Sequence, residues 1–152
     1  MVPIVYHASY SQLALPQHHR FPITKYQALY QYLRDNEIAP QEAFHQPQAV
    51  TPQWLSRIHS PDYVSQFIKQ SLDKKAIRRL GFPLSDRLTQ RTLYSIGGTH
   101  LACELALTHG VALQLSGGYH HAHYGFGSGY CVFNDLISAA VHAQTLNGID
   151  NV

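Results

Sequence analysis

The chain has 152 residues, of which 45% are hydrophobic and 13% are charged, and its formal net charge at pH 7 is +2. This composition predicts one folded domain with a hydrophobic core and excludes an intrinsically disordered chain. The near-neutral charge argues against nucleic-acid binding, because the longest basic runs are the pairs Lys74-Lys75 and Arg78-Arg79.

The cellular setting is constrained by what the sequence lacks. Cys103 and Cys131 show no paired spacing, so no disulfide framework is expected. The N-terminal residues have no basic region followed by a long apolar run, and no stretch of eighteen apolar residues occurs. We therefore expect no signal peptide, no membrane span and a reduced, cytoplasmic location.

Hydrophobic runs and turn residues predict an alternating α/β chain. Short apolar runs predict buried parallel strands, and apolar residues at helical spacing predict amphipathic helices. In chain order the expected elements are a strand at 3–6, a helix at 22–35, a strand at 43–45, helices at 52–58, 61–68, 73–80 and 85–109, a strand at 111–115 and a helix at 135–146. This order predicts a parallel sheet with helices on both faces.

Glycines mark the expected ends and contacts of several helices. Gly81, Gly110 and the pair Asn147-Gly148 are well placed to terminate the helices that precede them. Gly97-Gly98 lies inside the longest helix, where each glycine costs about 1 kcal/mol relative to alanine. We interpret that pair as a place where a neighbouring segment packs closely.

One loop concentrates the residues that could carry chemistry. The sequence Gly117-Gly118-Tyr119-His120-His121-Ala122 directly follows the strand expected at 111–115, and an Asn-Asp helix start closes the loop. A pair of histidines in a loop is more often a solvated turn than a site. The position favours a site here, because ligands bind outside the carboxyl ends of strands in open α/β sheets and imidazoles move protons near neutral pH.

The blocks GGYHHA and GSGYCVFND resemble the tandem-histidine block of the zinc-dependent histone deacetylase superfamily, which includes acetoin-utilisation and polyamine deacetylase relatives. The stretches HRFP with KY, HSPDYV and SIGGT also match, and they occur in the family's order over nearly the whole chain. The loop at 81–85 is most similar to the class IV and bacterial branch.

The resemblance implies a three-layer, arginase-like fold, in which a parallel sheet is flanked by helices and the domain is roughly twice as long as this chain. Residues 1–152 would then be the N-terminal half of a single deacetylase domain, with an incomplete sheet. The family's Zn²⁺ ligands, two aspartates and one histidine, would lie beyond residue 152. We therefore assign no metal ligand within the chain.

The resemblance also implies roles for individual residues. His121 is the expected general base and then general acid, and His120 is expected to stabilise developing negative charge. Tyr130 would form a wall of the acyl-lysine channel, which Gly129 would keep thin. Arg20 would line an internal channel and hold a product carboxylate, although a surface arginine is an equally good interpretation.

The function implied is hydrolysis of an amide that joins an acetyl or longer acyl group to a lysine-like amine. The family's loop aspartate that grips a peptide main chain is missing at 82–84, which favours an acylated lysine or acylated small amine over histone tails. The isolated chain is expected to be inactive. Two alternatives remain: a non-catalytic truncated paralogue that binds or dimerises through its open sheet edge, or a proteolytic fragment that pairs with its own copy.

Overall fold

A small parallel sheet lies at the centre of the computed structural model, which describes residues 1–146, 149 and 151–152. Its strands are β1 (Ile4–Val5), β2 (Phe44–His45) and β3 (Leu113–Gln114), in the order β2-β1-β3. Ile4 pairs with Phe44 on one side and with Leu113 on the other. The predicted parallel α/β arrangement is confirmed, although β1 and β3 are shorter than the apolar runs that predicted them.

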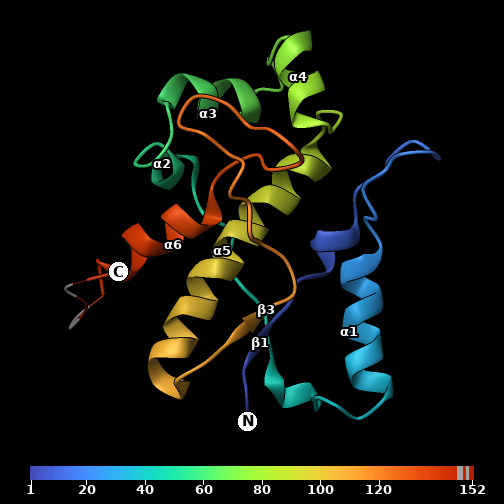
Figure 1. The fold of residues 1–152 in the computed structure, drawn as a ribbon, viewed down its shortest axis with the longest axis vertical. Coiled ribbons are helices and arrows are strands. Elements are labelled where there is room, and N and C mark those ends of the chain that lie inside the picture. Colours follow the sequence, from blue (N-terminus) through green and yellow to red (C-terminus); the bar gives the residue numbers. More distant parts are fainter. Residues whose placement is uncertain (147–148, 150) are drawn as a thin grey trace.

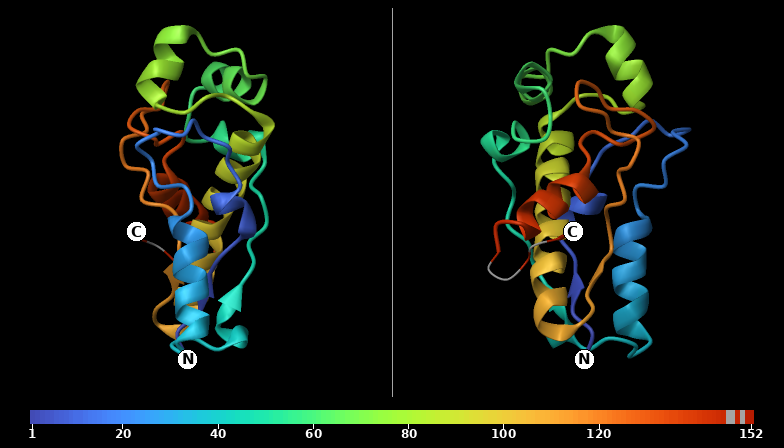
Figure 2. Two further views of the ribbon diagram at one scale, coloured as in Figure 1. Left: turned by 90° about the vertical axis from the view of Figure 1, so that its right-hand side faces the viewer. Right: turned by 60° about the vertical axis from the view of Figure 1, so that its left-hand side comes forward.

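Helices flank this sheet and extend beyond it (Figures 1 and 2). The two longest, α5 (Asp86–His109) and α1 (Lys25–Asp35), lie on opposite sides of the strands. The others are α2 (Pro52–Leu55), α3 (Pro61–Ile68), α4 (Lys74–Leu80) and α6 (Asp135–Ala143), with 3-10 turns at Ala8–Ser11 and Gln41–Ala43. Among the described residues, no helix is both long and apolar enough to cross a membrane.

Side-chain caps explain where several helices begin. The side chains of Thr51, Asp73 and Ser85 accept hydrogen bonds from backbone N–H groups in the first turns of α2, α4 and α5. Gly81 and Gly110 end α4 and α5 in the left-handed region, as predicted. The last helix was predicted to reach Leu146, but α6 ends at Ala143. Its predicted terminator, Asn147-Gly148, lies outside the described residues.

The paired glycines of α5 do mark close packing. A Cβ atom on Gly97 would overlap the backbone carbonyl oxygen of Gln48, and one on Gly98 would overlap the Tyr10 hydroxyl. The segment after β2 therefore runs directly against α5. The main core lies between α3, α4, α5 and the end of the loop that follows β3, and its fully buried side chains are those of Leu55, Phe67, Leu80, Phe82, Leu88, Ile96 and Phe133.

Candidate active site

The histidine loop occupies residues 115–134, between β3 and α6, at the carboxyl end of the strands (Figure 1, orange). Its far side is tied to the end of α4, because Gly129 N–H donates to the Arg79 carbonyl oxygen at 3.2 Å and Tyr130 N–H donates to that of Leu80 at 2.8 Å. The loop thus joins the end of the sheet to the helices that lie beyond it.

His120 and His121 are held side by side on this loop. Their ring centroids are 4.1 Å apart, the ring planes are inclined by 52°, and both residues are exposed. Nδ1 of His120 donates to the Gly118 carbonyl oxygen at 3.1 Å, since a carbonyl oxygen only accepts. The neutral His120 ring therefore carries its proton on Nδ1 and leaves Nε2 as an acceptor. Adjacent residues of a regular strand point to opposite faces, so this irregular loop is what brings the two rings together.

Gly129 and Tyr130 lie next to the pair. A Cβ atom on Gly129 would lie 3.7 Å from Cδ2 of His121, which places the glycine backbone against that ring. Tyr130 has a φ of 69°, unusual for a residue with a side chain. Its ring packs over Gly81, where an added Cβ would meet Cε1 at 2.8 Å, and lies 5.1 Å from the Phe21 ring. The predicted catalytic pair and channel wall are therefore adjacent.

Two arginines near the loop differ in their burial. Arg20 is exposed. By contrast, Arg91 of α5 is only 1% exposed, and its guanidinium is buried near the loop. Nε of Arg91 donates to the Tyr10 carbonyl oxygen at 3.0 Å, and Nη2 donates to the Tyr26 hydroxyl at 3.0 Å. Burial raises the pKa of Tyr26 to about 12, so this hydroxyl stays protonated near neutral pH.

The base of the loop is a buried polar network. The Tyr119 hydroxyl lies 2.8 Å from the Ser95 hydroxyl and 2.7 Å from the Ser116 hydroxyl. The Asp135 carboxylate, fully buried, accepts from the Tyr119 N–H at 2.7 Å and from the Gly118 N–H at 3.0 Å. The residues that directly precede the exposed histidines are therefore held by buried hydrogen bonds.

His59 joins the loop to α3 and α6. Its ring is 2% exposed; Nδ1 donates to the His123 carbonyl oxygen at 2.9 Å, and Nε2 accepts from the Asn134 N–H at 3.0 Å. Burial lowers the pKa of His59, and the bonds to the carbonyl oxygens of His123 and Tyr124 partly oppose that effect. His59 is thus a buried residue that contacts the start of α6.

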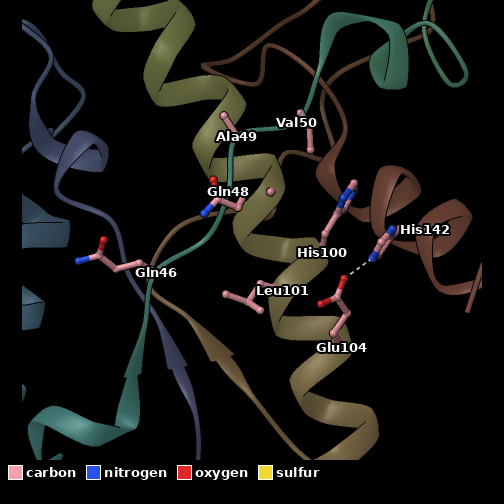
Figure 3. Close-up of a pocket in the computed structure, with 9 residues that line it drawn as sticks. Gln46, Gln48, Ala49, Val50, His100, Leu101, Glu104 and His142 are labelled. Atoms are coloured by element: carbon pink, nitrogen blue, oxygen red, sulfur yellow. Dashed lines mark hydrogen bonds and ion pairs between the residues drawn. The ribbon is translucent and has the colours of Figure 1, made fainter.

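A second histidine pair lies away from this loop, at a cavity of about 260 Å³ between α5, α6 and the segment after β2 (Figure 3). The rings of His100 and His142 stack with centroids 4.4 Å apart and planes 5° apart. Nε2 of His142 lies 2.6 Å from Oε1 of Glu104, and Nε2 of His100 shares a 2.8 Å hydrogen bond with the Ser138 hydroxyl. Burial and the neighbouring His142 lower the pKa of His100 to about 4.

No cluster of three or more His, Cys, Asp or Glu side chains suited to a metal ion occurs among the described residues. The second pair does not supply one, although Glu104 is close to His142. A ligand set for the expected Zn²⁺ is therefore not found within the described part of the chain.

The paired imidazoles lie at the carboxyl end of parallel strands, which is where open α/β sheets place their ligand sites. Residues 19–152 match the histone deacetylase domain, and the chain belongs to that family. It is 44% identical over 137 residues to an uncharacterised protein of Picosynechococcus sp., covering 90% of this chain and 45% of that protein.

One further sequence relative and one solved structure are also similar to the chain. Histone deacetylase 2 of Arabidopsis thaliana is 30% identical over 151 residues, which cover 93% of this chain and 38% of that protein. The crystal structure of an HDAC homologue from Aquifex aeolicus matches with a TM-score of 0.77 at 19% identity, covering 97% of this chain and 42% of that chain. The fold is thus the deacetylase fold in part, and the chain spans less than half the length of these relatives.

Two buried residues of the site were not singled out by the sequence. Asp135 was read only as the first residue of a helix, and nothing local distinguishes its carboxylate from an exposed one at the same position. Arg91 did leave a signal, because it lies three residues after Leu88 and four before Ser95 on one stripe of α5, and all three are buried. A charged residue on the helix face that carries Leu88 predicts a buried polar contact.

Proposed function

We propose that this chain supplies the proton-transfer and channel residues of a zinc-dependent hydrolase that removes acetyl or longer acyl groups from lysine-like amines. The observation that carries the proposal is the His120–His121 pair, held with ring centroids 4.1 Å apart beside Gly129 in a chain of the histone deacetylase family. The metal's ligands would come from outside the described residues.

The two imidazoles would divide the proton handling. His121, whose ring faces the Gly129 backbone, would take a proton from the attacking water and return it to the leaving amine. His120, with its Nδ1–H held by the Gly118 carbonyl oxygen, would carry a second proton on Nε2 and so stabilise negative charge as it develops on the substrate. Both rings are exposed, so a substrate can approach them from solvent.

The substrate's apolar stem would lie against Tyr130. This ring is half-buried, and the left-handed backbone that holds it is tied to the Leu80 carbonyl oxygen. An aromatic face of this kind suits the methylene chain of an acylated lysine or of an acylated small amine. Arg20 is proposed to hold the product carboxylate, a role that its exposure makes dependent on a covering segment.

The test is a panel of acyl-lysine and acyl-amine substrates, with Zn²⁺ added, on the full-length gene product, including any residues that follow Val152. His121→Ala is expected to lower kcat by about 10²- to 10⁴-fold, the usual contribution of a positioned acid–base group. His123→Ala is the matched control, because His123 is exposed on the same loop, and its kcat should stay within about threefold of the unmodified protein.

The result separates the proposal from its alternative. Full activity in His121→Ala would remove the general-base role, and the isolated 152-residue chain should turn over none of the substrates. If the full-length protein stays inactive across the panel, the non-catalytic binding or dimerisation module becomes the better interpretation, and light scattering should then show an oligomer.

A further inference from the structure

The carboxylate of Asp135 is buried and uses its hydrogen bonds on the histidine loop. Oδ1 accepts from the Tyr119 N–H at 2.7 Å, and Oδ2 accepts from the Gly118 N–H at 3.0 Å and from the Thr99 hydroxyl at 2.7 Å. The residue is 0% exposed. Burying a carboxylate is costly unless it is well hydrogen-bonded, so these contacts are what hold the charge in place.

Asp135 is not needed to start α6, because its neighbour already does so. The side-chain oxygen of Asn134 accepts from the Ile137 N–H at 3.1 Å, which is the usual capping bond. The Asp135 side chain instead points away from its own helix to the loop before the histidines and to α5. Its position at the first turn adds a favourable interaction with the helix dipole.

The backbone before His120 is shaped to accept this carboxylate. Gly117 has a φ of 108°, and a Cβ there would lie 2.6 Å from Oδ2 of Asp135, so a side chain is excluded. The next residue, Gly118, donates its N–H to the carboxylate, and its carbonyl oxygen accepts from Nδ1 of His120. Asp135, the Gly118 residue and the His120 ring thus form a continuous hydrogen-bonded chain.

We propose that Asp135 is a positioning residue for the histidine pair: its carboxylate fixes the backbone that orients His120 and, through the next residue, His121. This inference rests on the proposed function, since orientation matters for turnover only if the pair transfers protons. Residues that orient a reacting group without touching the substrate typically change activity by about 10- to 100-fold when altered.

The test compares the same substitution at two helix starts in the full-length gene product. Asp135→Asn keeps the shape but replaces one accepting oxygen with an amide group that cannot accept. Asp86→Asn is the matched control, because Asp86 is the first residue of α5, is exposed and bonds only the Gln70 side chain among the described residues. The readouts are kcat, KM and the ¹⁵N NMR signals of the His120 and His121 rings.

Asp135→Asn is expected to lower kcat by about 10- to 100-fold, to leave KM within about threefold, and to shift the His120 ring signals. Asp86→Asn should change none of these. An unchanged kcat in Asp135→Asn, or lower stability with unchanged ring signals, would overturn the proposal. If the unmodified protein proves inactive, the proposed function fails, and unshifted ring signals in Asp135→Asn would still reject the positioning role by themselves.

Thr99→Val covers the case in which Asp135→Asn does not fold. It removes one of the three bonds to the carboxylate and leaves both backbone contacts in place. A decrease in kcat of about threefold with a small shift of the His120 signals would support the proposal, and signals identical to those of the unmodified protein would contradict it.

Discussion

Two pairs of histidines lie ring against ring in this molecule, and they differ in almost every other respect. His120 and His121 are consecutive, exposed and inclined by 52° on a loop. His100 and His142 come from two helices, stack within 5° of parallel, and include a ring that is 8% exposed. The comparison shows that ring contact alone does not define a site; access to solvent and the partners of the ring nitrogens decide what a pair can do.

The electrostatics of the two pairs follow from these surroundings. His100 is desolvated and faces another imidazole, so its pKa falls to about 4 and the ring is neutral over most of the physiological range. The exposed rings of the loop remain in contact with water. His100 and His142 are therefore part of the packing between α5 and α6, whereas His120 and His121 are open to solvent.

Alanine variants of the two histidine pairs should differ most in folding stability. His100→Ala should lower the free energy of unfolding by about 2–3 kcal/mol, because it leaves a cavity and removes the bond to Ser138. His121→Ala should change it by no more than about 0.5 kcal/mol, since its ring is exposed. Urea denaturation of both variants measures this, and equal losses would contradict the comparison.

The two histidine pairs should also differ in how they make the free energy of unfolding depend on pH. The folded-state pKa of His100, about 4, lies below the ordinary value of 6.5, so folding favours the neutral ring. Its contribution to stability is complete above pH 6.5 and is lost as the pH falls from 6.5 towards 4, on the order of 2–3 kcal/mol in total. Denaturation midpoints across this range should fall, and His100→Gln should flatten the curve more than His121→Ala does.

The smallest expected effect comes from one hydrogen bond beside His100 and His142. The indole Nε1–H of Trp54 donates to the Ser138 hydroxyl at 3.0 Å, the same hydroxyl that contacts His100. Trp54→Phe should cost about 1 kcal/mol of unfolding free energy, the net value of one hydrogen bond. Tyr124→Phe, which alters an exposed hydroxyl of the histidine loop, is the control; a loss as large as that of Trp54→Phe would be unexpected.

Local patterns in the sequence were enough to predict several helix ends and one place of close packing. The terminating Gly81 and Gly110 and the close approach at Gly97 follow from short-range rules, and the structure confirms them. The helices predicted to begin at Asp73 and Ser85 begin one residue later, with these two side chains as their caps. The end of α6 was predicted wrongly, because apolar periodicity continues to Leu146 beyond the last helical residue, Ala143.

The parts of the site that could not be predicted depend on contacts between distant segments. Asp135 meets Thr99 across 36 positions, and His59 meets Asn134 across 75. The second histidine pair joins residues on α5 and α6 that no short motif connects. Contacts between distant segments arise only from tertiary packing. A sequence motif therefore locates the histidine loop but does not identify the residues that fix its conformation.

The bridge made by His59 has a consequence for how the molecule responds to acid. Its two nitrogens join the carbonyl side of the loop to the first turn of α6, and only an uncharged ring can accept the Asn134 N–H. Gaining a second proton on Nε2 would break the bond from Asn134 and leave the Nδ1–H bond to the His123 carbonyl oxygen in place. Acid should therefore weaken the contact between the histidine loop and α6 through a buried imidazole that is distant in sequence from His120 and His121.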